Sequence, residues 1–115
     1  MLIRSQDKRM IVNFDNICTV SAFPEKDSED IYVEDGTGSL MVGRYSAKEK
    51  AMKVLDMIQD AYADAKLNEI LLPDVCKSAN ESQRGKDNTL IAKTIRKDFM
   101  KKMIFQMPAD SEVVV

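Results

Sequence analysis

RYSAKEKAMKVLDMIQDAYADAK, residues 44–66, is the stretch that decides the fold, because here the sequence indicates one secondary structure without ambiguity. Ser46 and Glu49 have the spacing of a capping box, in which each side chain accepts a hydrogen bond from the other residue's backbone N–H. The apolar residues recur at intervals of three and four, on one helical face: Ala51, Val54, Leu55, Ile58, Ala61, Tyr62 and Ala65. The sequence therefore predicts an amphipathic helix over residues 46–66, with Leu55 and Ile58 buried at its centre, that packs across another layer of structure.

The first 45 residues predict that layer, because five apolar-rich runs of strand length follow one another, at residues 2–5, 10–14, 17–23, 31–34 and 39–44. Four polar residues separate the first two runs, which is typical of a hairpin. The acidic loop PEKDSED at residues 24–30 and the turn Asp35–Gly38 separate the last three, since Asp-Gly readily adopts the positive φ of a hairpin turn. We expect an antiparallel meander.

Beyond residue 66 the patterns are weaker. An apolar cluster ends at Pro73, and residues 67–88 as a whole read as a variable, mobile loop. The rest of the chain predicts a second helix over residues 89–102, a final strand at 103–107 and an acidic tail at 108–115. This tail ends in Val113-Val114-Val115, for which two alternatives remain open: it adds to a sheet edge or it frays.

Together these elements predict a single domain over residues 1–115 of the α+β class. Its sheet is antiparallel, curled and built of five to six strands, and one long amphipathic helix packs across it. A second helix, near the C-terminus, completes the predicted domain. The nearest named architecture is a pleckstrin-homology-like half-barrel with a capping helix.

Composition excludes several functional classes. The chain has 115 residues, 44% of them hydrophobic and 31% charged, which is ordinary for a globular domain. No apolar run approaches the ~18 residues of a membrane span, and the first residues contain no apolar signal region. Two cysteines without C-x-x-C spacing indicate a reduced, cytoplasmic protein. Histidine, the commonest general base and metal ligand, is absent, so we expect no enzyme, no metal and no cofactor.

Three phrases of the sequence resemble a set of small uncharacterised proteins of Gram-positive bacteria and their prophages. They are IRSQDKRMIVNFDNI, VGRYSAKEKAMKVLDMIQDAY and IFQMPADSEV, and together they cover about half of the chain. The resemblance implies that Ser5-Gln6-Asp7-Lys8 is a structured turn and that Phe105-Gln106-Met107-Pro108 returns to the main body. It implies no activity.

Other candidate sites are better explained by structure than by chemistry. Gly36-Thr37-Gly38 lacks the third glycine of a nucleotide-binding loop and reads as a hairpin turn. Cys18 lies within a predicted strand and is expected to be a small buried residue, while Cys76 beside Lys77 is expected to be inert. Five carboxylates lack the spacing of a calcium loop and predict a solvated acidic loop: Asp27, Glu29, Asp30, Glu34 and Asp35.

One basic segment stands out against an acidic chain. Residues 1–83 carry a net charge of -5 and residues 84–102 a net charge of +5. If residues 89–102 are helical, one face presents four basic side chains that would contact nucleic-acid phosphates: Lys93, Arg96, Lys97 and Lys101. No aromatic residue alternates with them, and an acidic body repels a polyanion. Nucleic-acid binding is therefore the alternative hypothesis.

The favoured hypothesis is a non-catalytic protein-protein interaction module without a membrane role. It binds a protein partner or a second copy of itself, as a homodimer, through a sheet edge or a methionine-rich surface. Binding that falls steeply with salt would instead indicate the nucleic-acid alternative.

Overall fold

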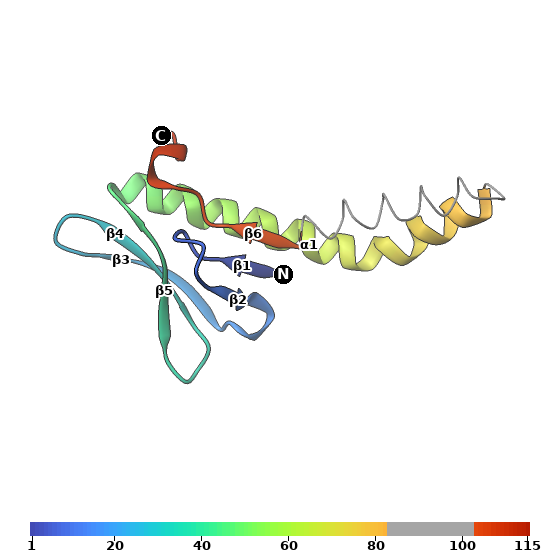
Figure 1. The fold of residues 1–115 in the computed structure, drawn as a ribbon, viewed down its shortest axis with the longest axis horizontal. Coiled ribbons are helices and arrows are strands. Elements are labelled where there is room, and N and C mark those ends of the chain that lie inside the picture. The colour runs from blue at the N-terminus through green and yellow to red at the C-terminus, as the bar shows by residue number, and fades with distance from the viewer. Residues whose placement is uncertain (83–102) are drawn as a thin grey trace.

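The computed structural model describes residues 1–82 and 103–115, whose strands lie beneath one long helix (Figure 1). The elements in chain order are β1 (Leu2–Arg4), β2 (Ile11–Asn13), the 3-10 helix η1 (Phe14–Asn16), β3 (Thr19–Pro24), β4 (Glu29–Glu34), β5 (Ser39–Tyr45), α1 (Lys48–Ser82), β6 (Ile104–Gln106) and the 3-10 helix η2 (Asp110–Glu112). The class is α+β, as predicted. The predicted second helix, residues 89–102, lies outside the described residues.

The strands form two three-stranded sheets, so the prediction of one curled sheet of five to six strands is wrong. Sheet A has the order β2-β1-β6 and sheet B the order β3-β4-β5. Sheet B is antiparallel throughout, and β1 and β2 form the predicted hairpin, with Ile3 opposite Val12. In contrast, β6 runs parallel to β1, with Ile3 opposite Phe105.

The break between the two sheets lies at η1. The Asn13 side chain accepts a hydrogen bond from the backbone N–H of Asp15 at 3.1 Å, a local turn that takes the chain out of the extended conformation. The Phe14 N–H still donates to the Met1 carbonyl of sheet A at 3.0 Å, whereas the Cys18 N–H already donates to the Glu34 carbonyl of sheet B at 2.8 Å. Residues 15–17 lie between those two bonds, so the change from one sheet to the other takes only three residues.

Gln6 joins the two sheets again. Its backbone N–H donates to the Val42 carbonyl at 2.8 Å, its side-chain oxygen accepts from the Arg44 N–H at 2.9 Å, and its side-chain nitrogen donates to the Arg44 carbonyl at 3.0 Å. These are the bonds that a neighbouring strand would make to β5. The same nitrogen lies 3.3 Å from the Pro108 carbonyl, so Gln6 also holds the C-terminal segment.

Gly43 on β5 lets the C-terminal segment approach closely. A Cβ atom there would lie 3.0 Å from both Met107 Cε and Tyr45 Cε2. Met107 and Tyr45 are almost fully buried, and the Tyr45 hydroxyl donates to the Pro108 carbonyl at 2.8 Å. Burial also raises the pKa of the Tyr45 phenol. Residues 105–108 thus return to the body of the protein, as the resemblance implied.

The long helix differs from its prediction at both ends. It begins at Lys48 without the predicted capping box, because the Ser46 hydroxyl donates to Asp110 at 3.0 Å instead of accepting from Glu49. It continues to Ser82, through the segment predicted to be a mobile loop. Pro73 removes one intrahelical hydrogen bond without ending the helix.

The C-terminal tail is folded against the start of α1 and forms no strand. The Asp110 carboxylate accepts from the Ser46 N–H at 2.8 Å and from Lys50 Nζ at 3.3 Å, and these bonds lower its pKa. Val113 is buried, while Val114 and Val115 are exposed. The prediction that Val113-Val114-Val115 provides a strand edge for pairing is therefore not supported.

Apolar side chains from both sheets, α1 and the tail share one core. Ile3 of β1, Ile31 and Val33 of β4 and Val54 of α1 are almost inaccessible to solvent. Ile58 is buried as predicted, but Leu55 is only half-buried, at the margin of the helix face.

We expect Ile58→Ala to lower the free energy of unfolding by about 2–5 kcal/mol, because it leaves a cavity under α1. Leu55→Ala should cost about 1–2 kcal/mol, since its side chain is already partly in water. Urea unfolding followed by circular dichroism measures both, and equal losses would contradict the placement of Leu55 at the margin.

We expect Gln6→Ala to destabilise the protein by about 1–3 kcal/mol, because it leaves backbone groups of β5 without their partners. Gln59→Ala, on the exposed surface of α1, is the matched control and should change the stability by less than about 0.5 kcal/mol. Similar melting temperatures for the two variants would show that Gln6 does not hold the sheets together.

Candidate functional site

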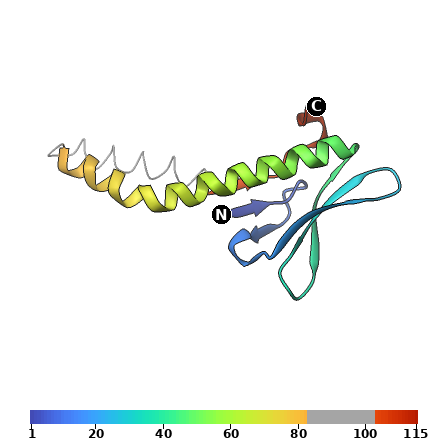
Figure 2. The ribbon, with the colours of Figure 1, turned by 180° about the vertical axis from the view of Figure 1, so that it is seen from behind.

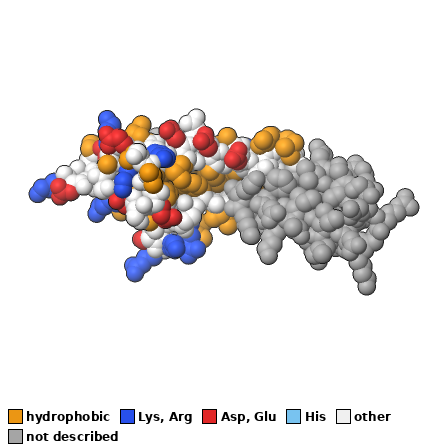
Figure 3. All heavy atoms as spheres, turned by 90° about the horizontal axis from the view of Figure 1, so that it is seen from above, with side chains coloured by type: hydrophobic (Ala, Val, Ile, Leu, Met, Phe, Trp, Pro, Cys, Tyr) orange, Lys and Arg blue, Asp and Glu red, His pale blue; other side chains and the backbone are white. Residues whose placement is uncertain are grey.

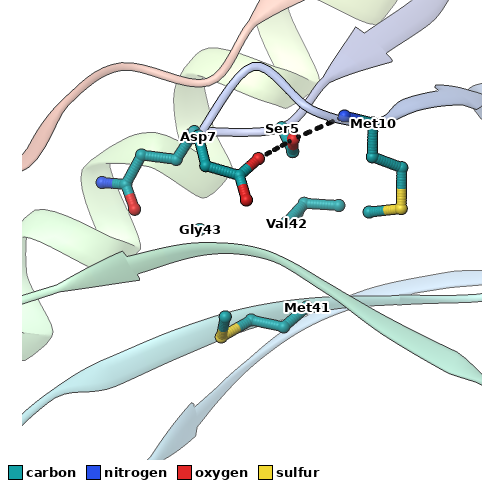
Figure 4. A pocket seen from close by; sticks show the side chains of 7 residues that line it. Ser5, Asp7, Met10, Met41, Val42 and Gly43 are labelled. Carbon is teal, nitrogen blue, oxygen red and sulfur yellow. Dashed lines mark hydrogen bonds between the residues drawn. The ribbon is translucent and has the colours of Figure 1, made fainter.

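The turn after β1 and the neighbouring strand β5 enclose a small cavity of about 180 Å³ (Figure 4). Its lining residues are Ser5, Gln6, Asp7, Met10, Met41, Val42 and Gly43. The Ser5 hydroxyl donates to Asp7 at 2.6 Å and accepts from the Met10 N–H at 3.1 Å. Asp7 also accepts from the Arg9 N–H at 3.0 Å.

The polar groups of this cavity are therefore already used to build the turn. The hydrogen bond from Ser5 is the main reason that the pKa of Asp7 is lowered, so the carboxylate is a fixed acceptor of the turn. Lys8 adopts a φ of 66°, which the bond from its N–H to the Ser5 carbonyl supports. We conclude that Ser5–Lys8 is the structured turn that the resemblance implied and that its role is structural.

A second concavity, of about 310 Å³, has a different character. It is an apolar groove between α1 and the start of sheet B, and below it is called the α1–β3 groove. Its lining residues are Phe14, Val20, Leu55, Ile58, Gln59 and Tyr62. Ile58 is buried, Val20 and Leu55 are half-buried, and Gln59 is exposed at the rim. This groove thus presents apolar surface without the internal hydrogen bonds that occupy the turn cavity.

One end of the α1–β3 groove is closed by aromatic and charged side chains. The rings of Phe14 and Tyr62 meet edge to face at 5.0 Å, and the Lys66 ammonium lies 5.4 Å from the centre of the Tyr62 ring. Lys66 is 3.1 Å from Asp15 and 3.3 Å from Glu69. These two carboxylates raise the pKa of Lys66 to about 12, so its ammonium stays charged at physiological pH.

The edge strand β3 borders the groove. It pairs with β4 along its whole length, from Thr19 opposite Glu34 to Pro24 opposite Glu29, and it has no strand on its other side among the described residues. An edge strand presents every second backbone N–H and C=O outwards, where they can pair with another chain. Its side chains Val20 and Ala22 point into the core, towards α1. The groove therefore combines an open strand edge with an adjoining apolar surface.

Acidic side chains lie along the solvent-facing surface of α1. Figure 3 looks down on the molecule and shows acidic side chains one after another along one long edge of the described part. Asp56 and Asp60 belong to the i, i+4 row that begins with Lys48 and Met52, and helical spacing turns them about 100° and 140° away from Leu55. Both carboxylates are exposed and form no ion pair with another described residue.

The opposite face of sheet B carries a smaller patch of large side chains. Phe23 and Tyr32 lie edge to face at 5.9 Å, and Tyr32 is opposite Met41. Next to them, Arg44 binds the fully buried Asp30 through two hydrogen bonds of 3.0 and 3.1 Å. This ion pair compensates the charge of Arg44.

The other candidate sites from the sequence either have structural roles or consist of residues that the structure does not bring together. Gly36 has a φ of +93° and forms the hairpin turn. Asp35 accepts from the Thr37 N–H and hydroxyl in that turn. Cys18 is exposed, so the prediction that it is buried is wrong, because it precedes β3 instead of lying within it. Within residues 1–82 and 103–115 no group of three potential ligands gathers that could hold a metal ion.

Two predictions concern side chains that the structure does not describe. The basic side chains Lys93, Arg96, Lys97 and Lys101 lie outside the described residues. Cys76 lies on the α1 backbone, although a loop was predicted there. In the part of the chain that is described, no helix is both long and apolar enough to cross a membrane.

Comparison with models of protein families, with curated proteins and with solved structures finds no match to this chain. The function of the candidate site therefore has to be inferred from its geometry. Sequence patterns missed the α1–β3 groove, because they placed Leu55 in the middle of the buried helix face. The one available signal was that the apolar stripe is wide enough to extend past the core to Leu55 and Tyr62.

We expect Asp30→Asn to destabilise the protein by about 1.5–3 kcal/mol at pH 7, because it removes a charge-assisted hydrogen bond from a buried site. The bond from Arg44 lowers the pKa of Asp30 from 3.8 in the folded state. Because the pKa of Asp30 is lower in the folded than in the unfolded state, the ionised carboxylate stabilises the folded protein at pH values above the unfolded pKa. This contribution is lost as the pH falls below about 4. Urea unfolding at pH 7 and pH 3 should therefore show a smaller difference between variant and wild type at pH 3. The exposed Asp27→Asn is the control, and a difference that does not narrow at low pH contradicts the role of the ion pair.

Proposed function

We propose that this protein is a non-catalytic interaction module that binds an extended segment of another polypeptide by strand addition at β3. The observation that supports this function is the α1–β3 groove beside an unpaired strand edge. In strand addition, backbone hydrogen bonds to the edge provide affinity, and pockets for alternate side chains provide selectivity. The α1–β3 groove offers both elements in one place.

The shape of the groove suits an added strand. A segment paired with β3 would direct every second side chain towards α1, as Val20 and Ala22 of β3 already are. Those side chains would contact the half-buried Leu55 and the buried Ile58. The closed end at Phe14, Tyr62 and Lys66 would limit how far the segment extends in that direction.

Nucleic-acid binding is the alternative that the sequence raises, and it depends on Lys93, Arg96, Lys97 and Lys101. The described residues offer it little support, since the cation Arg44 is paired with Asp30 and the exposed side of α1 is acidic. A protein partner is therefore the better proposal.

Selection from a display library of random dodecapeptides against the full chain tests this function. We expect the enriched peptides to bind wild-type protein with micromolar affinity and to bind Leu55→Gln about tenfold more weakly, which corresponds to about 1.4 kcal/mol. Leu40→Gln is the matched control, because Leu40 is also partly exposed but lies on β5, away from the groove. Fluorescence anisotropy measures the three affinities.

Amide hydrogen exchange distinguishes strand addition from other modes of peptide binding. Added backbone hydrogen bonds should slow exchange at alternate amides of β3 in the complex. Enrichment of no peptide, or binding that Leu55→Gln and Leu40→Gln weaken equally, would contradict the proposed function. Unchanged exchange in β3 would contradict strand addition.

A further inference from the structure

The residues that line the α1–β3 groove indicate which side chain of an added segment it accepts. This inference rests on the proposed function, since it concerns the ligand of the same groove. Phe14, Val20, Leu55 and Ile58 contribute apolar surface, and Gln59 is exposed at the rim. None of the described residues that line the groove carries a charge.

The charge beside the closed end of the groove is already compensated. Lys66 lies 3.1 Å from Asp15 and 3.3 Å from Glu69, while its ammonium is 5.4 Å from the centre of the Tyr62 ring. A charged side chain of the ligand would therefore lose water in the groove without gaining an unpaired partner of opposite charge. The groove thus favours an uncharged side chain.

One position of an added strand, called the anchor below, directs its side chain into the groove. Val20 is the residue of β3 that lines the groove, and its side chain points into the core, towards α1. The residue opposite Val20 on an added strand has its Cβ about 4.5–5.5 Å from that of Val20 and points to the same face of the sheet. Its side chain therefore extends towards Leu55 and Gln59 of α1.

The volume and the walls of the groove suit an aromatic ring at the anchor. The concavity measures about 310 Å³, and an apolar cavity of about 150 Å³ is large enough to bind benzene. The rings of Phe14 and Tyr62 meet edge to face at 5.0 Å, so a ring from the ligand would find aromatic partners there. Valine or leucine would bury less apolar surface and leave more of the groove to water.

The glutamine at the rim distinguishes one aromatic side chain from another. Gln59 lies one helical turn from Leu55 and from Tyr62, and its amide is in contact with water. We propose that the anchor of the ligand is a tyrosine, whose ring occupies the apolar part of the groove and whose hydroxyl donates to the side-chain oxygen of Gln59. Phenylalanine would bury the same ring without this hydrogen bond. Gln59 is thus a specificity-determining residue.

The test uses four heptapeptides with blocked ends that alternate threonine and valine, with the central valine replaced by tyrosine, phenylalanine, leucine or glutamate. We expect the tyrosine peptide to bind the full chain about threefold more tightly than the phenylalanine peptide, since one hydrogen bond near water is gained. The leucine peptide should bind about five- to tenfold more weakly than the tyrosine peptide, and the glutamate peptide more weakly still. Fluorescence anisotropy measures the four affinities.

Variants of Gln59 separate the hydrogen bond from the apolar contact. Gln59→Leu should abolish the preference for tyrosine over phenylalanine and leave the phenylalanine peptide bound at least as tightly as by wild type. Gln59→Glu retains a hydrogen-bond acceptor and should retain the preference. Asp64→Leu is the matched control, because it places the same leucine about 140° around α1 from Gln59, outside the groove lining.

Equal binding of the tyrosine and leucine peptides, or tightest binding of the glutamate peptide, overturns the inference. A preference for tyrosine over phenylalanine that survives in Gln59→Leu overturns the role of Gln59. If the four peptides bind equally and Leu55→Gln weakens them all, the proposed function stands without the tyrosine anchor. Binding of none of them overturns the inference, and the library selection then decides separately whether the groove binds peptides at all.

Discussion

The hydrogen bonds of Gln6 to β5 are the interaction on which the rest of this structure depends. The chain leaves the extended conformation at η1 and builds its strands as two separate sheets, so something must fix one sheet against the other. Gln6 does this by offering β5 one backbone donor, one side-chain acceptor and one side-chain donor, at 2.8, 2.9 and 3.0 Å. It thereby takes the place of a strand at that edge, and its further contact with Pro108 fixes the returning C-terminal segment at the same point.

This arrangement distinguishes the two edges of sheet B among the described residues. Gln6 binds the outer edge of β5 at Val42 and Arg44. The helix α1 crosses the inner face of the sheet, as Figure 2 shows from behind, and the core lies between the helix and the sheet. The edge of β3 receives no such cover from the described residues. The same helix passes above that edge with Leu55 half-buried, so the margin of the core becomes the floor of a groove. The candidate site is thus a consequence of how the two sheets are joined.

The sequence predicts local structure here better than it predicts assembly. The β1–β2 hairpin, the turn at Gly36 and the buried position of Ile58 all follow from spacing of a few residues, and the structure confirms them. Two of the failures are long-range: β6 joins β1 across the whole chain, and Ser46 binds Asp110 rather than Glu49. A third is local, because Pro73 and the polar residues after it indicated a loop where α1 continues to Ser82. Periodicity carries no information about such contacts. It also placed Leu55 with Ile58, because helical spacing defines a face but not where the neighbouring layer ends.

An open strand edge is ordinarily a hazard, because it can pair with the same edge of a second copy. Two copies joined antiparallel through β3 would place both α1 helices on the same face of the combined sheet. Each helix would then keep its half-buried Leu55 beside the shared edge, so a second copy and a foreign segment would compete for the same groove.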